Sequence, residues 1–378
     1  MVGGGVKCWG SNVAGQGGRG FLGSSGATAL PAVGLSGVTN IAAQLSSTCA
    51  VVAGGKVECW GDNYDGQLGN GKYDNEIEHI LNPAIPLNYE PGKAYEPTPV
   101  EVIGPGNVPL TGAVRVDMGD AHACALIGNG DVYCWGNADS GRLGNGAYGG
   151  RYLTAQRVLT PYGPLTGAVS LSVGSFHSCV TTNVGTVWCW GANNGGQLGI
   201  GYVTKQNEDM PLAQPVQWLS WGGSGYLAYT WAVSAAQGST CSIGMAQGGN
   251  VIRCWGASPD GQLGFNPGIS NVEFATDQTV NLANPVAISA GIAHYCATND
   301  IGQALCWGLG MSGQLGAGLV NQWSPQLVGG NGIGGVMQTA LSPDHSCARR
   351  HDGAVFCWGS DMLGKSGGGG VGPTHIPT

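Results

Sequence analysis

Short segments in which apolar and polar residues alternate recur along the chain, and glycine-rich turns separate them. One unit shows the pattern in full, with four short strands expected at residues 113–119, 124–126, 132–136 and 156–159. Asn129-Gly130, between the second and third of these segments, is a typical two-residue hairpin turn. Because no segment has a sustained apolar period of about 3.6 residues, the pattern predicts an all-β chain rather than helices.

The tripeptide Cys-Trp-Gly occurs seven times and defines an internal repeat. Successive tryptophans are 51, 75, 55, 65, 52 and 51 residues apart, and they lie at Trp9, Trp60, Trp135, Trp190, Trp255, Trp307 and Trp358. A four-stranded unit repeated at this interval is typical of a β-propeller blade. We therefore expect a single β-propeller domain over residues 1–378, with insertions at 72–97 and 202–231.

The residues after each tryptophan identify a family. Gly66-Gln67-Leu68-Gly69 follows Trp60, and the same four letters recur from Gly196, Gly261 and Gly313. This segment resembles the repeat of the regulator of chromosome condensation family. The resemblance covers essentially the whole chain and implies a seven-bladed propeller with a central channel. It implies little about activity, because similar propellers serve as a nucleotide-exchange factor, an ultraviolet-B photoreceptor and a β-lactamase inhibitor.

The seventh repeat is expected to be incomplete. Only 20 residues follow Trp358 and eight precede Trp9, so one unit lacks about 22 residues. The missing part corresponds to the inner strand and the second strand of the blade that contains Cys8. We expect six complete four-stranded blades and one incomplete blade formed by the two termini, residues 6–10 and 374–378. Its exposed strand edges predict a tendency to self-associate.

The charge of the chain excludes some partners. Its formal net charge is −8, and the 14 Lys and Arg residues form no basic run, so we expect no nucleic-acid partner. The same observation opposes nucleotide exchange or chromatin binding of the kind carried out by the family's namesake. No apolar stretch approaches the roughly 20 residues needed to cross a bilayer, and the sequence as it begins at Met1 shows no secretory signal peptide.

Twelve of the thirteen cysteines fall into pairs on neighbouring strands. Directly opposed residues of an antiparallel hairpin lie within disulfide reach, so we expect the bonds Cys49–Cys59, Cys124–Cys134, Cys179–Cys189, Cys241–Cys254, Cys296–Cys306 and Cys347–Cys357. Cys8 is expected to be free. Six such pairs favour an oxidising compartment and a secreted, periplasmic or extracellular protein. Reduced, buried cysteines are the alternative.

Four histidines occupy equivalent places in four repeats, and they suggest a metal site. His122, His177, His294 and His345 follow the turn after the inner strand. Imidazole is the commonest metal ligand, and Asp117, Asp120 or Asp344 could complete a divalent metal site at the channel. The alternative is a structural role, in which each histidine forms hydrogen bonds with the local backbone and stabilises its own blade. The metal reading supports one function from a different class, a metal-dependent hydrolase; otherwise we expect no cofactor.

The turns between inner and second strands form the candidate binding face, because they resemble the turns that carry partner contacts in related propellers. They contain Leu45, Ser46, Asp120, Ala121, Ser175, Phe176, Ile292, Ala293, Pro343 and Asp344. The leading interpretation is an extracellular scaffold that binds a protein or a glycan through this face. We assign no catalytic residue, since the sequence has no nucleophile elbow or zinc-protease motif.

Two further motifs carry no function in our interpretation. The segment from Gly359 to Ser366 matches the phosphate-loop pattern, but the glycines after it cannot begin the helix which that motif requires. The photoreceptor's Gly-Trp-Arg-His-Thr motif has no Trp-Arg counterpart here, as Gly119-Asp120-Ala121-His122 shows.

The insertion at 202–231 is rich in aromatic residues, which are common in carbohydrate and protein contacts.

Overall fold

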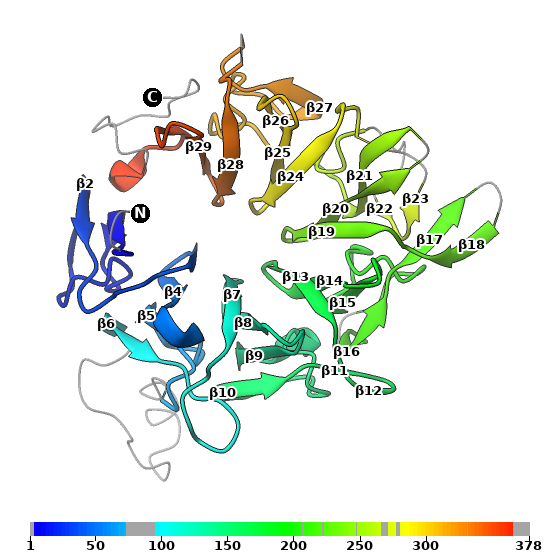
Figure 1. The fold of residues 1–378 in the computed structure, drawn as a ribbon. Helices are drawn as coiled ribbons and strands as arrows, with labels where there is room; N and C mark the ends of the chain where they lie inside the picture. Colours follow the sequence, from blue (N-terminus) through cyan, green and yellow to red (C-terminus); the bar gives the residue numbers. More distant parts are fainter. Residues whose placement is uncertain are drawn as a thin grey trace.

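The computed structural model describes residues 4–72, 95–205, 208–220, 223–246, 248–265, 271–276, 280–330 and 332–365. Most of these residues form antiparallel sheets, the blades, which are arranged around a central axis with the first strand of each blade at the centre and its other strands further out (Figure 1). The all-β propeller expected from the repeat is confirmed. Among the described residues, no helix is long and apolar enough to cross a membrane.

Five blades have four strands each, paired in chain order from the centre outwards. The first blade contains β3 (Asn40–Gln44), β4 (Ser47–Val51), β5 (Val57–Asp62) and β6 (Tyr95–Glu101). The second contains β7 (Ala113–Met118), β8 (His122–Ile127), β9 (Val132–Asn137) and β10 (Arg151–Arg157). The third contains β13 (Ala168–Val173), β14 (His177–Thr182), β15 (Val187–Gly191) and β16 (Met210–Pro215).

The remaining blades follow the same plan. The fourth contains β19 (Thr230–Ala235), β20 (Ser239–Ala246), β21 (Gly249–Ala257) and β22 (Asn271–Val272). The fifth contains β24 (Pro285–Ala290), β25 (His294–Asn299), β26 (Ala304–Gly308) and β27 (Gln322–Leu327). The sixth has three strands in the described part of the chain, namely β28 (Val336–Leu341), β29 (His345–Arg350) and β30 (Val355–Gly359), followed by the short 3₁₀ turn η3 (Met362–Gly364).

The predicted count of seven blades is wrong, because the described residues form six. Between the sixth and first blades lies a two-stranded sheet of β1 (Lys7–Asn12) and β2 (Gly23–Pro31) (Figure 1). These strands correspond to the third and fourth strands of a blade and have no inner or second strand beside them in the described structure. The expected contribution of residues 374–378 to this incomplete blade lies outside the described residues.

The outer strand of the second blade also differs from its prediction. It spans Arg151–Arg157, whereas the sequence pattern suggested residues 156–159. Strand β10 pairs with β9 through a register irregularity between Tyr152 and Gln156. This interruption hides the alternation on which the prediction depended.

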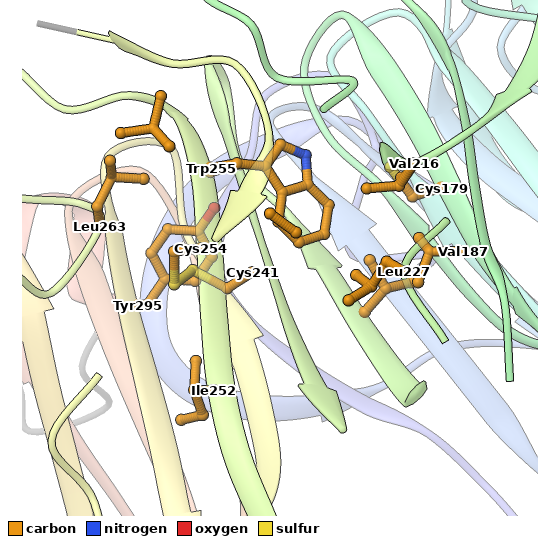
Figure 2. Packing of buried hydrophobic residues seen from close by; sticks show 14 of the residues in the cluster. Cys179, Val187, Val216, Leu227, Cys241, Ile252, Cys254, Trp255, Leu263 and Tyr295 are labelled. Carbon is orange, nitrogen blue, oxygen red and sulfur yellow. A yellow bond between two sulfur atoms is a disulfide. The ribbon is translucent and has the colours of Figure 1, made fainter. Parts of the chain in front are cut away.

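The tryptophans of the repeat pack between blades. Trp60, Trp135, Trp190, Trp255, Trp307 and Trp358 are fully buried. Figure 2 shows the Trp255 ring beside Val216, Val187 and Leu227 of the preceding repeat, with the Cys241–Cys254 disulfide close by. Each large ring thus fills the space between two sheets, where an aromatic side chain removes the most apolar surface from water.

A hydrogen bond from each tryptophan fixes neighbouring repeats to one another. The indole Nε1 of Trp135 donates to the carbonyl of Gln67 at 2.9 Å, seven residues after the preceding tryptophan. The same bond joins Trp60 to Gln16, Trp190 to Arg142, Trp255 to Gln197, Trp307 to Gln262 and Trp358 to Gln314. The glycines of the Gly-Gln-Leu-Gly loop allow this approach: Gly69 has φ +64°, and a Cβ there would lie 2.7 Å from the Trp135 ring.

Candidate functional site

The six inner strands surround a central cavity of about 260 Å³. Its walls are formed by β3, β7, β13, β19, β24 and β28 together with the glycines that directly follow β13 and β24. Its lining includes the small polar residues Ser172, Ser234 and Ser289 among apolar ones. Arg115 and Gln338 are exposed in the same lining. A ligand in the cavity would therefore meet polar groups from every blade.

Several of these polar groups join one inner strand to the next. Asn40 Oδ1 accepts a 2.8 Å hydrogen bond from the Val116 amide, and Ser172 Oγ accepts one of 2.9 Å from the Ala235 amide. Asp117 accepts bonds from the amides of Val173 and Met118. Because the Asp117 carboxyl is buried, desolvation raises its pKa, although the two amides and Arg115 act against this shift. Asp117 thus holds two blades together, and the structure does not place it as a ligand for a metal.

The ten residues of the candidate binding face lie in the turns at one end of the ring, as the repeat predicts. Ser175 and Ala293 are buried, Leu45 is exposed, and the other seven are partly exposed. The hairpin turns between second and third strands, which contain Val184 and Ile301, lie at the opposite end because successive strands are antiparallel. Substitutions in the turns of the candidate binding face can therefore be compared with control substitutions in the hairpin turns at the opposite end.

Charged and aromatic side chains order this face. Gln44 Nε2 donates to Asp120 Oδ1 at 3.0 Å, which links the turns of the first and second blades. The Arg142 guanidinium lies 5.1 Å from the centre of the Phe176 ring, a cation–π arrangement that holds the ring in place. These contacts leave Asp120 and Phe176 partly exposed in fixed positions.

Asp344 and Lys365 form an ion pair beside the two-stranded sheet of β1 and β2. Lys365 Nζ lies 2.8 and 3.1 Å from the two carboxylate oxygens. Burial alone would raise the pKa of Asp344, but hydrogen bonds from His345 and Lys365 and the Lys365 charge outweigh it and lower the pKa. Asp344 is therefore a fixed negative charge on this side of the face.

Three of the four candidate metal-binding histidines are committed to neighbouring blades. His122 Nε2 is 3.0 Å from Ser178 Oγ, and His177 Nε2 is 2.8 Å from Thr240 Oγ1. His294 Nε2 is 2.9 Å from Ser346 Oγ. All three rings are fully buried, and desolvation lowers the pKa of His177 and of His294 to about 3. The pKa of His122 is also lowered well below its usual value, mainly by burial.

His345 differs, because its ring is partly exposed and its Nδ1 contacts Ser342 and Asp344. The four imidazoles thus have separate partners, three across blade interfaces and His345 within its own turn, and the structure does not bring them together. Across the described residues, no group of three or more His, Cys, Asp or Glu side chains could hold a metal ion.

The cysteine predictions are confirmed residue by residue. All six expected disulfides are present, and the paired Cα atoms lie 4.0–4.2 Å apart. Cys8 is free and half-buried, and burial raises the pKa of its thiol. A second cavity of about 450 Å³ adjoins it, between β1 and the sheets of the sixth and first blades.

Sequence reasoning missed the residues of the inner strands that line the channel. Arg115 and Gln338 were not candidates, although both lie on strands with a recognisable alternating pattern. Arg142, which stands in the place of the loop glutamine, was also missed as the partner of Phe176. Its departure from the Gly-Gln-Leu-Gly pattern was the signal that could have identified it.

The structure describes the second of the two predicted insertions more fully than the first. Residues 73–94 of the first insertion lie outside the described part of the chain. The second contributes β17 (Gln217–Ser220) and β18 (Gly223–Tyr226), which pair with each other, and β17 also pairs in parallel with β23 (Ala275–Thr276). Tyr226, at the end of β18, is exposed, and so are Tyr229 and Trp231 in the residues that follow.

Comparison with known proteins identifies the repeat. Two models of the regulator of chromosome condensation (RCC1) repeat match residues 113–142 and 168–197, and residues 54–126 and 184–242, respectively. The chain is 26% identical over 330 residues to the mitochondrial RCC1 domain-containing protein RUG3 of Arabidopsis thaliana, covering 84% of this chain and 69% of RUG3.

It is also 28% identical over 298 residues to the ultraviolet-B receptor UVR8 of the same plant, covering 77% of this chain and 58% of the receptor. Among solved structures, yeast RCC1 (Prp20) bound to Kap60 matches with a TM-score of 0.78 and 20% identity, over 100% of this chain and 84% of that one. The chain thus carries RCC1 repeats in an RCC1-like β-propeller.

Proposed function

We propose that this RCC1-repeat propeller is an extracellular scaffold that binds a protein through the end of the ring carrying Asp120 and Phe176. The observation that carries the proposal is the construction of that face. Partly exposed side chains there are held in place by contacts between blades, such as Gln44 with Asp120 and Arg142 with Phe176. A pre-ordered surface loses less conformational entropy on binding than a mobile one.

The chemistry of this face suits a protein more than a glycan. It combines exposed Leu45 and partly exposed Phe176 with the carboxylates Asp120 and Asp344. Aromatic anchors bordered by charged groups are typical of the centre and rim of protein interfaces. The likeness to RCC1-like propellers supports the same choice, since yeast Prp20 is seen bound to the protein Kap60.

The extracellular setting is supported by the cysteines. Six disulfides, one in each blade, persist in oxidising compartments and are rare where glutathione keeps thiols reduced. The alternative of a metal-dependent hydrolase has no supporting observation among the described residues, because the histidines are bonded separately.

A comparison of variants at the two ends of the ring tests the proposal. Asp120→Ala and Phe176→Ala change the proposed face, and Val184→Ala and Ile301→Ala change exposed positions at the other end. Partners captured from the extracellular fluid by the parent protein should be lost by the first pair and kept by the second. Loss caused by Val184→Ala and Ile301→Ala, with retention by the first pair, would assign binding to the other end.

A further inference from the structure

Charged residues are distributed unevenly between the two ends of the third and fourth blades. Residues 158–252 contain only three charged residues, Lys205, Glu208 and Asp209. These three directly precede β16, whose first residue pairs with Gly191 at the end that carries the candidate binding face. At the opposite end, the inner strands and hairpin turns of these two blades contain no Lys, Arg, Asp or Glu in the sequence.

Large apolar side chains are exposed at that opposite end. In five blades the second residue of the inner strand is exposed and lies at a register irregularity of the strand pair, where an extra residue interrupts the alternation. These five residues are Val114, Val169, Trp231, Val286 and Met337. Four neighbouring residues are exposed as well, namely Val184, Tyr229, Met245 and Ile301.

We refer to the exposed apolar residues of the third, fourth and fifth blades as the apolar sector. It consists of Val169, Val184, Tyr229, Trp231, Met245, Val286 and Ile301. A contiguous exposed apolar surface of this kind marks a site that contacts a protein or a membrane. Asp300, beside Ile301, is a carboxylate at its border and accepts a 3.0 Å hydrogen bond from Asn284 Nδ2.

Backbone hydrogen bonds join the parts of the apolar sector to one another. The Thr230 amide donates to the carbonyl of Gly185 at 3.0 Å, which connects the turn of Val184 to the start of β19. The Met245 amide donates to the carbonyl of Tyr229 at 2.9 Å. Tyr229 is 76% exposed and has φ +57°, a conformation that residues other than glycine rarely adopt. Strain of this kind is found most often at functional positions.

The apolar sector also has a flat arrangement. Val169, Trp231 and Val286 occupy the same strand position in three successive blades, and the blades are related by rotation about the central axis (Figure 1). Equivalent residues of such repeats lie at the same height along the axis. A flat surface laid across this end of the ring would therefore contact all three at once.

A lipid bilayer suits this arrangement better than a folded protein does. Trp and Tyr side chains are enriched where a bilayer meets water, and apolar side chains beside them enter the boundary between headgroups and acyl chains. Protein interfaces usually surround their apolar centre with a polar rim. The inner strands and hairpin turns of the third and fourth blades supply no charged group for such a rim.

We propose that the apolar sector binds the surface of an electrically neutral phospholipid bilayer, with Trp231 and Tyr229 at the headgroup level and Val184 and Ile301 inserted beside them. Anionic lipids attract basic groups, whereas this chain has a net charge of −8 and an uncharged contact surface. The proposal does not rest on the proposed protein-binding function, because the two surfaces lie at opposite ends of the ring. A bilayer-bound propeller would keep Asp120 and Phe176 directed away from the lipid.

Flotation of the full-length protein with phosphatidylcholine vesicles tests the proposal. The parent protein should float with the vesicles, and binding should persist between about 0.1 and 1 M salt because no charge pair is involved. Val184→Asp and Ile301→Asp should each lower the partition coefficient about tenfold, since a carboxylate would have to leave water. Leu45→Asp is the matched control, because it places the same charge at an exposed apolar position of the other end.

Fluorescence shows which residue meets the lipid. Brominated phosphatidylcholine should quench part of the tryptophan emission of the parent protein. Trp231→Phe keeps an aromatic ring and should still bind, but this lipid-dependent quenching should be largely lost. All of these positions are exposed, so circular dichroism and the unfolding temperature should match those of the parent protein.

Absence of flotation with phosphatidylcholine would overturn the proposal, as would equal losses of binding for Leu45→Asp and Val184→Asp. So would binding that needs phosphatidylserine and disappears at high salt. A dimer dissociated by Val184→Asp, with no binding to vesicles, would assign the apolar sector to a second copy of the chain instead. Asp120→Ala and Phe176→Ala should leave vesicle binding unchanged, which separates this test from that of the protein-binding face.

Discussion

The indole Nε1 of Trp9 donates a 2.9 Å hydrogen bond to the carbonyl oxygen of Lys365, which lies 356 residues away in the sequence. Lys365 follows Trp358 by seven residues, as Gln67 follows Trp60, so this bond repeats the link found between the other neighbouring repeats. The two ends of the described chain are therefore joined by the same contact that joins the blades, although the described residues include no inner strand there.

Substitution of this tryptophan should cost less than substitution of a buried one. Trp9→Phe removes the bond to Lys365 at a partly exposed site, and we expect a loss of no more than about 1 kcal/mol in the free energy of unfolding. Trp135→Phe leaves the buried Gln67 carbonyl without its donor, which costs about 1–3 kcal/mol in addition to the lost ring volume. Chemical denaturation of both variants measures the difference, and equal losses would mean that the Trp9 link matters as much as a complete interface.

The cysteines permit a direct count. Denatured without reductant, the protein should show one reactive thiol, that of Cys8. Thirteen reactive thiols would show that the hairpin cysteines are reduced, and would remove the support for an oxidising compartment. If one thiol is found, mass spectrometry of unreduced peptides should assign each disulfide bond to two cysteines of the same blade.

The loop glycines should be sensitive according to what lies beside them. Gly69 and Gly71 both have positive φ, but a Cβ on Gly69 meets the Trp135 ring whereas one on Gly71 has open space around it. Gly71→Ala should cost about 1–2 kcal/mol, from the backbone conformation alone. Gly69→Ala should lower the free energy of unfolding by about 1–3 kcal/mol more than Gly71→Ala does, because the added methyl group overpacks the loop against the ring. Similar unfolding free energies for the two variants would argue against tight packing of this loop on the tryptophan.

The buried histidines should make the fold sensitive to acid. The pKa of His177 is lowered to about 3 by burial, against about 6.5 for an unperturbed imidazole. Between these pH values the unfolded state binds more protons, so the free energy of unfolding falls as the pH decreases. His177→Gln removes this titration. It should reduce the slope of the free energy of unfolding against pH by up to about 1.4 kcal/mol per pH unit.

Thr240→Val is the matched control for that variant. It removes the hydrogen-bond partner of His177 but keeps the imidazole, so it should lower stability while retaining the slope. If His177→Gln leaves the pH dependence unchanged, another group must be responsible for it.

Much of the fold could be predicted from the sequence because each repeat carries its own local signals. The Asn129-Gly130 turn and the paired spacing of Cys124 and Cys134 define a hairpin without knowledge of the rest of the chain. The resemblance to the repeat family gives the wrong count of seven blades, whereas the chain length predicts that the repeat containing Cys8 lacks its inner and second strands. A complete blade requires inner strands as well as the Cys-Trp-Gly strand, and the first copy of the motif forms a sheet with β2 alone.

The candidate site was less predictable, because equivalent positions in a repeat do not imply convergent side chains. The four histidines share a sequence position, yet the first three reach sideways to Ser178, Thr240 and Ser346 in the next blade. Those contacts depend on how one sheet packs on another, which no pattern within a single repeat records. For the same reason the link from Gln44 to Asp120 was not foreseen.

Amide hydrogen exchange, measured with and without a bound protein partner, tests the proposed binding face most directly. Exchange should slow in the turns around Asp120, Phe176 and Ile292 and stay unchanged in the hairpin turns around Val184 and Ile301 at the opposite end. Slower exchange around Val184 and Ile301, with no change around Asp120 and Phe176, would contradict the proposal that this end of the ring binds the partner.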